Sequence, residues 1–194
     1  MKTIKTNDLL QQLQSDTRQI ILETKLLLQQ DPELLIQQPA PGKWSVAQVI
    51  EHLNAYGHYY IPEIRKALEN QKYSPDELYH PGWLGNYFTN SMKPTPDKQI
   101  RNKMKSLKNY SPVPELDSKV VIDEFLNQQQ ELLILLDQAS ANNISRIRIP
   151  ISITKFIRFK LGDTFRFVIA HQQRHFVQCS NVMLALRNPP VAVA

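Results

Sequence analysis

Residues 163–187 read DTFRFVIAHQQRHFVQCSNVMLALR, and the spacing of their apolar side chains decides the class of fold. These side chains recur at steps of three and four residues, which is the period of an amphipathic α-helix. They are Phe165, Val168, Ile169, Phe176, Cys179, Val182, Met183 and Leu186. The pattern predicts a helix that begins at Asp163, a residue suited to the N-cap position, and that buries one face.

Three earlier segments have the same helical period. The first spans about residues 7–30, the second starts at Ser45, and the third spans about residues 118–140. Ser45 and Gln48 have the spacing of a capping box, whereas Pro62 should kink the second helix or end its regular part. The pattern predicts an all-α protein, a four-helix bundle with a long crossover between helices two and three.

The connections between these helices differ in kind. The crossover, roughly residues 71–117, is long for a compact domain and too rich in aromatic residues to be a solvated linker. We expect it to fold over one end of the bundle, with Trp83 and Tyr87 forming either a pocket lid or simple cover. The link at residues 147–153 alternates like a short strand, and Pro150 confines it to an edge or an extended crossing.

Composition bounds the class of protein. The chain has 194 residues, which suits one domain spanning residues 1–194, and its 42% apolar content is ordinary for a globular protein. No run approaches the ~18 apolar residues of a membrane span, and no signal-peptide hydrophobic region is evident. The single cysteine, Cys179, has no partner for an internal disulfide, which agrees with a reducing compartment. We therefore expect a cytoplasmic protein in which Cys179 is an inert buried thiol.

The charge is mildly basic, at +5 with 23 Lys and Arg against 18 Asp and Glu. Part of the excess gathers in one cluster, namely Lys98, Arg101, Lys103, Lys105 and Lys108. Such a cluster can bind nucleic acid or an anionic surface, but it lacks interleaved aromatic residues and a recognisable motif. The pattern favours a solvated loop, with neither nucleic acid nor a membrane as partner. A homodimer formed through an apolar face stays open.

Three histidines could form a metal site. His171 and His175 lie one helical turn apart on the same face, at the margin of the buried stripe. His52 has the same relation to the apolar stripe of the second predicted helix. Burial keeps imidazole neutral, which is the form that binds metal ions, and three such ligands leave a fourth position open. The alternative is that the histidines are hydrogen-bonded core residues.

Several side chains close to these histidines in the sequence each have two possible roles. Tyr56 and Tyr59 follow His52 and could supply a hydroxyl near the metal, or simply pack. Arg174 could pair with a substrate carboxylate or form a salt bridge within the fold, and Gln178 could orient an imidazole. Gln172 replaces the general-base glutamate of an H-E-x-x-H helix, which argues against a metalloprotease of that type.

Two segments carry a resemblance to a known family. Residues 43–53, KWSVAQVIEHL, resemble the W-S-x-x-x-x-x-x-H-L segment of the DinB-like superfamily, and residues 171–178, HQQRHFVQ, look like its closing H-x-x-R-H-x-x-Q helix. The spacing between the two segments also fits, so the resemblance covers essentially the whole chain. It implies a four-helix bundle in which His52, His171 and His175 surround a divalent metal ion, commonly zinc or nickel.

The resemblance also implies a function. Characterised members of this bacterial superfamily join low-molecular-weight thiols such as bacillithiol to electrophiles, or use mycothiol or glutathione in isomerisation. We therefore expect a metal-dependent enzyme that transfers a small thiol to an electrophile. Two alternatives stay open, a hydrolase that uses the same three histidines and a non-enzymatic ligand-binding or stress-associated bundle. The long crossover departs from the familiar pattern and leaves the thiol and the electrophile undetermined.

Overall fold

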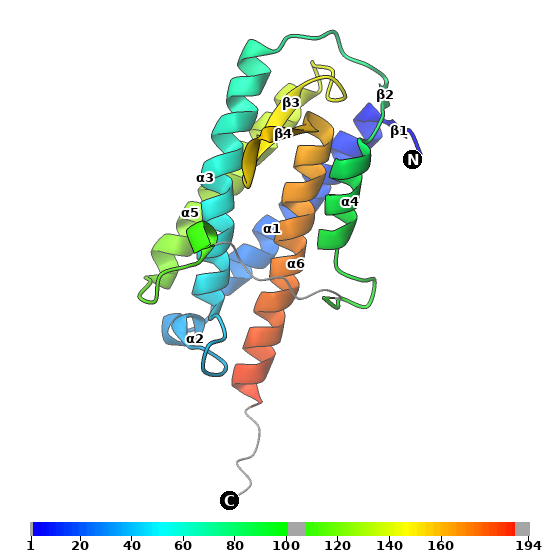
Figure 1. Ribbon diagram of the computed structural model, residues 1–194. Coiled ribbons are helices and arrows are strands. Elements are labelled where there is room, and N and C mark those ends of the chain that lie inside the picture. The colour runs from blue at the N-terminus through cyan, green and yellow to red at the C-terminus, as the bar shows by residue number, and fades with distance from the viewer. Residues whose placement is uncertain (1, 101–107, 189–194) are drawn as a thin grey trace, which may run out of the picture.

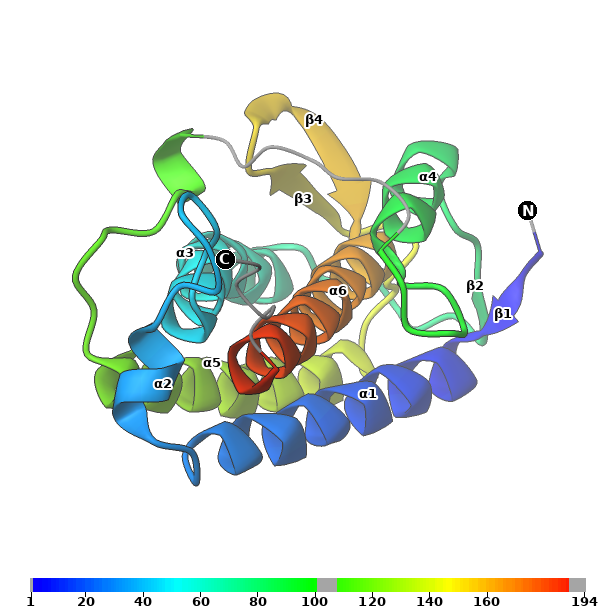
Figure 2. The same cartoon turned by 90° about the horizontal axis from the view of Figure 1, so that it is seen from below.

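Four long helices form the core of the protein, whose computed structural model describes residues 2–100 and 108–188 (Figure 1). They are α1 (Thr6–Leu27), α3 (Val46–Asn70), α5 (Ser118–Ala139) and α6 (Leu161–Arg187). Each packs against two of the others, so that neighbours round the bundle follow the order α1, α5, α3, α6 (Figure 2). The prediction of an all-α four-helix bundle is confirmed.

The predicted capping box is present at the start of α3. The Ser45 hydroxyl accepts the backbone N–H of Gln48 at 3.2 Å, and Gln48 Oε1 accepts the backbone N–H of Ser45 at 3.0 Å. Pro62 was expected to kink α3 or to end its regular part, and the helix does not end there but continues to Asn70. Proline removes only the hydrogen bond to the carbonyl of His58, and both residues are exposed, so water can satisfy that carbonyl.

Several short elements are absent from the sequence-based prediction. They are β1 (Ile4–Lys5), α2 (Pro32–Ile36), β2 (Leu78–Tyr79), α4 (Trp83–Met92) and the 3-10 helix η1 (Lys108–Tyr110), with β1 and β2 paired antiparallel. The last three belong to the crossover. In the described part of this crossover, α4 packs along α6 and η1 contacts α3, both on the sides of the bundle rather than over one end (Figures 1 and 2). Trp83 and Tyr87 are 72% and 62% exposed, so the predicted lid or cover is wrong for both.

A β-hairpin precedes α6. The predicted extended link forms β3 (Arg148–Ile151), which pairs antiparallel with β4 (Thr154–Lys160). Within the described residues this sheet has two strands, so Pro150 lies on an edge strand as expected. The strand β4 was not predicted, because its residues 155–158 are all exposed and show no alternation. It leads directly into α6, which therefore begins at Leu161 rather than at Asp163.

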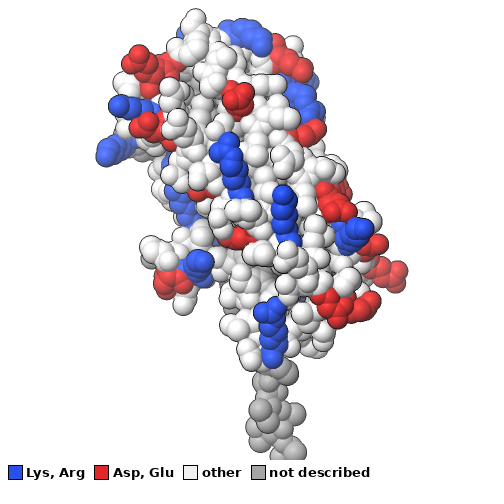
Figure 3. Space-filling model, turned by 180° about the vertical axis from the view of Figure 1, so that it is seen from behind, with Lys and Arg blue, Asp and Glu red and all other residues white. Residues whose placement is uncertain are grey.

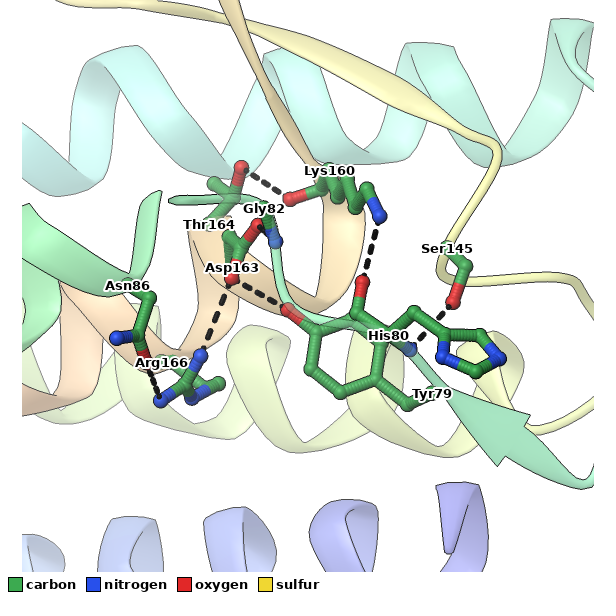
Figure 4. Close-up of polar contacts among 9 residues, drawn as sticks. All are labelled: Tyr79, His80, Gly82, Asn86, Ser145, Lys160, Asp163, Thr164 and Arg166. Carbon is green, nitrogen blue, oxygen red and sulfur yellow. Dashed lines mark hydrogen bonds and ion pairs between the residues drawn. The ribbon is translucent and has the colours of Figure 1, made fainter. Parts of the chain in front are cut away.

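Asp163 is not the N-cap of α6 but part of a buried polar network in its first turn (Figure 4). It is 1% exposed, and its carboxylate accepts hydrogen bonds from the Tyr79 hydroxyl at 2.5 Å and the Gly82 N–H at 2.8 Å. The Arg166 guanidinium lies 3.2 Å away and, together with the N-terminal end of the helix, offsets the negative charge. Through these hydrogen bonds to Tyr79 and Gly82, Asp163 holds the crossover against the start of α6.

The surface mixes charges of both signs. Lys and Arg side chains are interspersed with Asp and Glu over the face seen in Figure 3. Three members of the predicted basic cluster, Arg101, Lys103 and Lys105, lie outside the described residues. Among the helices that are described, none is both long and apolar enough to span a lipid bilayer.

Replacing Gly85 with alanine should separate α4 from α6. A Cβ atom at Gly85 would lie 2.4 Å from the Cβ of Asp163, which is buried and anchored to its own helix. We expect Gly85→Ala to lower the free energy of unfolding by roughly 1–3 kcal/mol in chemical denaturation. The control Asn90→Ala, on the exposed side of α4, should change it by less than about 0.5 kcal/mol. Wild-type stability in Gly85→Ala would contradict this close packing.

Candidate metal centre

The three histidines singled out in the sequence converge in the core of the bundle. His52 comes from α3, and His171 and His175 come from successive turns of α6. One ring nitrogen of each lies within 4.8 Å of the others, and the residues are only 4%, 5% and 8% exposed. Three imidazoles are therefore held together where water has little access.

The spacing of the ring nitrogens suits a metal ion. Nε2 of His171 lies 3.4 Å from Nε2 of His52 and 3.0 Å from Nε2 of His175. A tetrahedral ion with metal–nitrogen bonds of about 2.0–2.1 Å has its ligand atoms about 3.3 Å apart. The two observed spacings bracket this value.

Hydrogen bonds fix which nitrogen of two histidines carries the proton. Nδ1 of His52 donates to the carbonyl oxygen of Tyr110 at 2.6 Å, and Nδ1 of His175 donates to Oε1 of Gln178 at 2.9 Å. Because both partners are acceptors, each imidazole keeps its proton on Nδ1 and presents an unprotonated Nε2 to His171. His171 has one proton at most to share between them, so a cation among the three Nε2 atoms fits this arrangement better than a hydrogen bond does.

Of the two residues that accept these Nδ1 hydrogen bonds, Gln178 was predicted from the sequence and Tyr110 was not. Gln178 orients His175 in the way its position three residues further along the helix suggested. Tyr110 was not foreseen, because it acts through its backbone carbonyl and any residue can offer that group. No signal in the sequence marks such a contact.

Burial keeps all three imidazoles uncharged. Removal from water lowers the pKa of His52, although its hydrogen bond to Tyr110 opposes the change. Desolvation, and then the neighbouring imidazoles, hold the pKa of His171 well below its usual value. Desolvation, followed by the charge of His52, lowers the pKa of His175 to about 3. At neutral pH all three imidazoles are therefore neutral, which is the form that binds metal ions.

Aromatic rings enclose the histidines. The Trp44 ring lies 5.1 Å from that of His52, centroid to centroid. The Phe167 ring stacks parallel to His171 at 6.0 Å, and the Tyr56 ring lies 4.5 Å from His171. These rings add apolar surface around the histidine nitrogens, which strengthens electrostatic interactions at the site.

The two candidate tyrosines pack against neighbouring groups. The Tyr56 ring lies 4.3 Å from that of Tyr110, centroid to centroid, and the Tyr59 hydroxyl donates to the carbonyl of Ile151 in the hairpin at 3.0 Å. Burial, with Tyr60 and Tyr110 nearby, raises the pKa of Tyr56 to about 12. These contacts agree with the packing interpretation of both residues.

Two further residues of α6 are buried beside the histidines. Arg174 is 7% exposed, and its positive charge contributes to the lowered pKa of His171 and His175. Cys179 is 2% exposed, and burial raises the pKa of its thiol. Since the thiolate is the reactive form, Cys179 agrees with the expected inert thiol.

Acid should destabilise the metal-free protein through these histidines. An imidazole titrates near pH 6.5 in the unfolded chain but near pH 3 in buried His175, so between these values the unfolded state binds more protons. For His175 alone, the free energy of unfolding should fall by about 2 kcal/mol between pH 7.5 and pH 5. Denaturation of chelator-treated protein measures this fall, which should be smaller in His175→Gln. A pH-independent wild-type stability over this range would contradict the burial of neutral histidines.

Comparison with known proteins agrees with the fold. No curated protein matches the chain. Among solved structures it is similar to YfiT from Bacillus subtilis, described as a probable metal-dependent hydrolase with an unusual four-helix bundle topology. The two are 13% identical, with a TM-score of 0.53 over 91% of this chain and 85% of that one, which shows a shared fold. The sequence profile of the DinB superfamily matches residues 10–179, and the chain therefore belongs to that superfamily.

Proposed function

We propose that His52, His171 and His175 bind one divalent metal ion and that the protein is a metal-dependent enzyme. The observation that carries this proposal is the convergence of three buried imidazoles, with Nε2–Nε2 spacings of 3.0 and 3.4 Å. Zinc and nickel are the ions proposed, because both accept imidazole ligands. Membership of the DinB superfamily supports metal dependence, as does the similar fold of YfiT, itself described as a probable metal-dependent hydrolase.

The ligand set is that of a catalytic rather than a structural site. Within residues 2–100 and 108–188, no cysteine, aspartate or glutamate joins the three histidines as a fourth ligand. Structural zinc sites are normally closed by four protein ligands, whereas catalytic sites keep one position for a substrate or water. A divalent ion bound here would act as a Lewis acid that stabilises a thiolate or lowers the pKa of water to about 7.

The activity proposed is transfer of a low-molecular-weight thiol to an electrophile. Among the described residues, no carboxylate lies within ligand distance of the three histidines. Glu51, the neighbour of His52 in the chain, accepts a hydrogen bond from Asn54 at 3.3 Å. The Tyr56 hydroxyl, with its pKa raised to about 12, stays protonated at neutral pH. A thiol loses its proton near pH 8.5 and water only near 15.7, so a thiol nucleophile depends less on a protein base. Its sulfur would bond to the electrophilic carbon as the leaving group departs and its proton passes to solvent.

Hydrolysis is the second candidate. The specific observation in its favour is the similar fold of YfiT, described as a probable metal-dependent hydrolase. The same three histidines would serve, with water in place of the thiol. The two candidates differ in whether thiol is consumed, so one assay separates them.

Removing the metal should abolish the activity. We expect protein purified without chelator to contain about one divalent ion per chain by inductively coupled plasma mass spectrometry, and to convert small thiols and alkyl electrophiles to conjugates detected by mass. Chelator treatment, His52→Ala and His171→Ala should each remove both the ion and the conjugates, since each deletes part of the ligand set.

The matched control is His58→Ala, because His58 is an exposed histidine of the same helix that pairs with Glu124. It should keep the metal and the activity. Metal-dependent cleavage of esters or amides without loss of thiol would replace transfer by hydrolysis. A wild-type protein that takes up no metal even after reconstitution would contradict both.

A further inference from the structure

The contact that orients His52 differs in kind from the one that orients His175. Gln178 lies three residues beyond His175 in the same helix, so that contact can form whenever α6 forms. The partner of His52 is the carbonyl of Tyr110, which lies 58 residues further along the chain at the end of η1. His52 therefore depends on the crossover for the tautomer that leaves its Nε2 free.

Three contacts hold this part of the crossover, residues 108–113, against the bundle; we call it the η1 segment. The Tyr110 ring packs on that of Tyr56 at 4.3 Å, centroid to centroid. The Tyr110 hydroxyl donates to the carbonyl of Ser152 in the hairpin turn at 3.5 Å. Further along, the carbonyl of Val113 accepts from Nε2 of Gln48 at 3.4 Å. Gln48 also belongs to the capping box that begins α3, so the η1 segment is anchored one turn before His52.

The η1 segment also reaches the second helix of the site. The Tyr56 ring packs against both Tyr110 and His171, at centroid distances of 4.3 and 4.5 Å. Tyr110 thus contacts His52 directly through its carbonyl and approaches His171 through Tyr56. Displacement of this one residue would disturb histidines from both α3 and α6.

We propose that Tyr110 is a positioning residue for the metal site. Its ring holds the η1 segment in place and its carbonyl holds His52, so metal binding and docking of the η1 segment form one coupled equilibrium. The inference rests on the proposed function only in requiring that the three histidines bind a metal ion. Coupling of this kind is reciprocal: a change that loosens the η1 segment weakens metal binding, and the metal holds the η1 segment in place by the same factor.

Metal affinity tests the first half of this coupling. We would titrate metal-free protein with Zn²⁺ in competition with a chelating dye and compare wild type with Tyr110→Ala and Tyr110→Phe. Loss of a group that orients a metal ligand typically costs about 10–100-fold in affinity, which is the effect expected for Tyr110→Ala. Tyr110→Phe keeps the ring and should stay within about threefold of wild type.

The matched control is Tyr87→Ala, because Tyr87 belongs to the same crossover but is 62% exposed and lies on α4. It should bind zinc as wild type does. If Tyr110 had only a structural role, Tyr110→Ala would lower the melting temperature and leave the zinc affinity of the folded protein unchanged. That result would overturn the inference.

Hydrogen exchange in the wild-type protein tests the second half and does not depend on any variant folding. Zinc should slow exchange of the backbone amides of the η1 segment, while amides of β1 and β2, which lie on the far side of α6 from α3 (Figures 1 and 2), serve as the internal reference. Zinc binding that leaves exchange in the η1 segment unchanged would overturn the inference but keep the proposed function. A wild-type protein that binds no zinc would overturn both.

Discussion

The unprotonated Nε2 atoms of His52 and His175 both face His171 inside a buried site lined by aromatic rings. The packing of the surrounding helices holds these nitrogens close together. Such lone pairs repel one another unless a proton or a cation lies between them, and His171 can supply one proton to only one neighbour. The bundle brings the nitrogens together because α3 and α6 pack side by side, and because His171 and His175 are one turn apart. The capping box at Ser45 sets where α3 begins, two turns before His52.

Much of the fold could be predicted because it depends on local chemistry. Apolar side chains at helical spacing predict the four long helices, and Ser45 with Gln48 predicts the start of α3 to the residue. Helical geometry alone places His171 and His175 together. That His52 lies next to them depends on how α3 and α6 pack together. The family resemblance implied this proximity, whereas the periodicity of the apolar side chains did not.

The remaining features depend on contacts between distant parts of the chain, and no local pattern encodes them. Asp163 looks like an N-cap in the sequence, yet its carboxylate binds Tyr79, 84 residues away, because β4 runs straight into α6 (Figure 4). The exposed residues of β4 lack the alternation by which a strand is recognised. Tyr110 acts on His52 through a backbone carbonyl, which carries no signature of residue type.

The crossover is therefore part of the site rather than a linker, since the carbonyl of Tyr110 orients His52, which α3 supplies. X-ray absorption spectroscopy at the edge of the bound metal shows whether the three histidines share one ion. For zinc we expect three imidazole nitrogens at about 2.0–2.1 Å and one exchangeable light ligand. A shell of oxygen atoms alone, or a spectrum unchanged in His52→Ala, would contradict it.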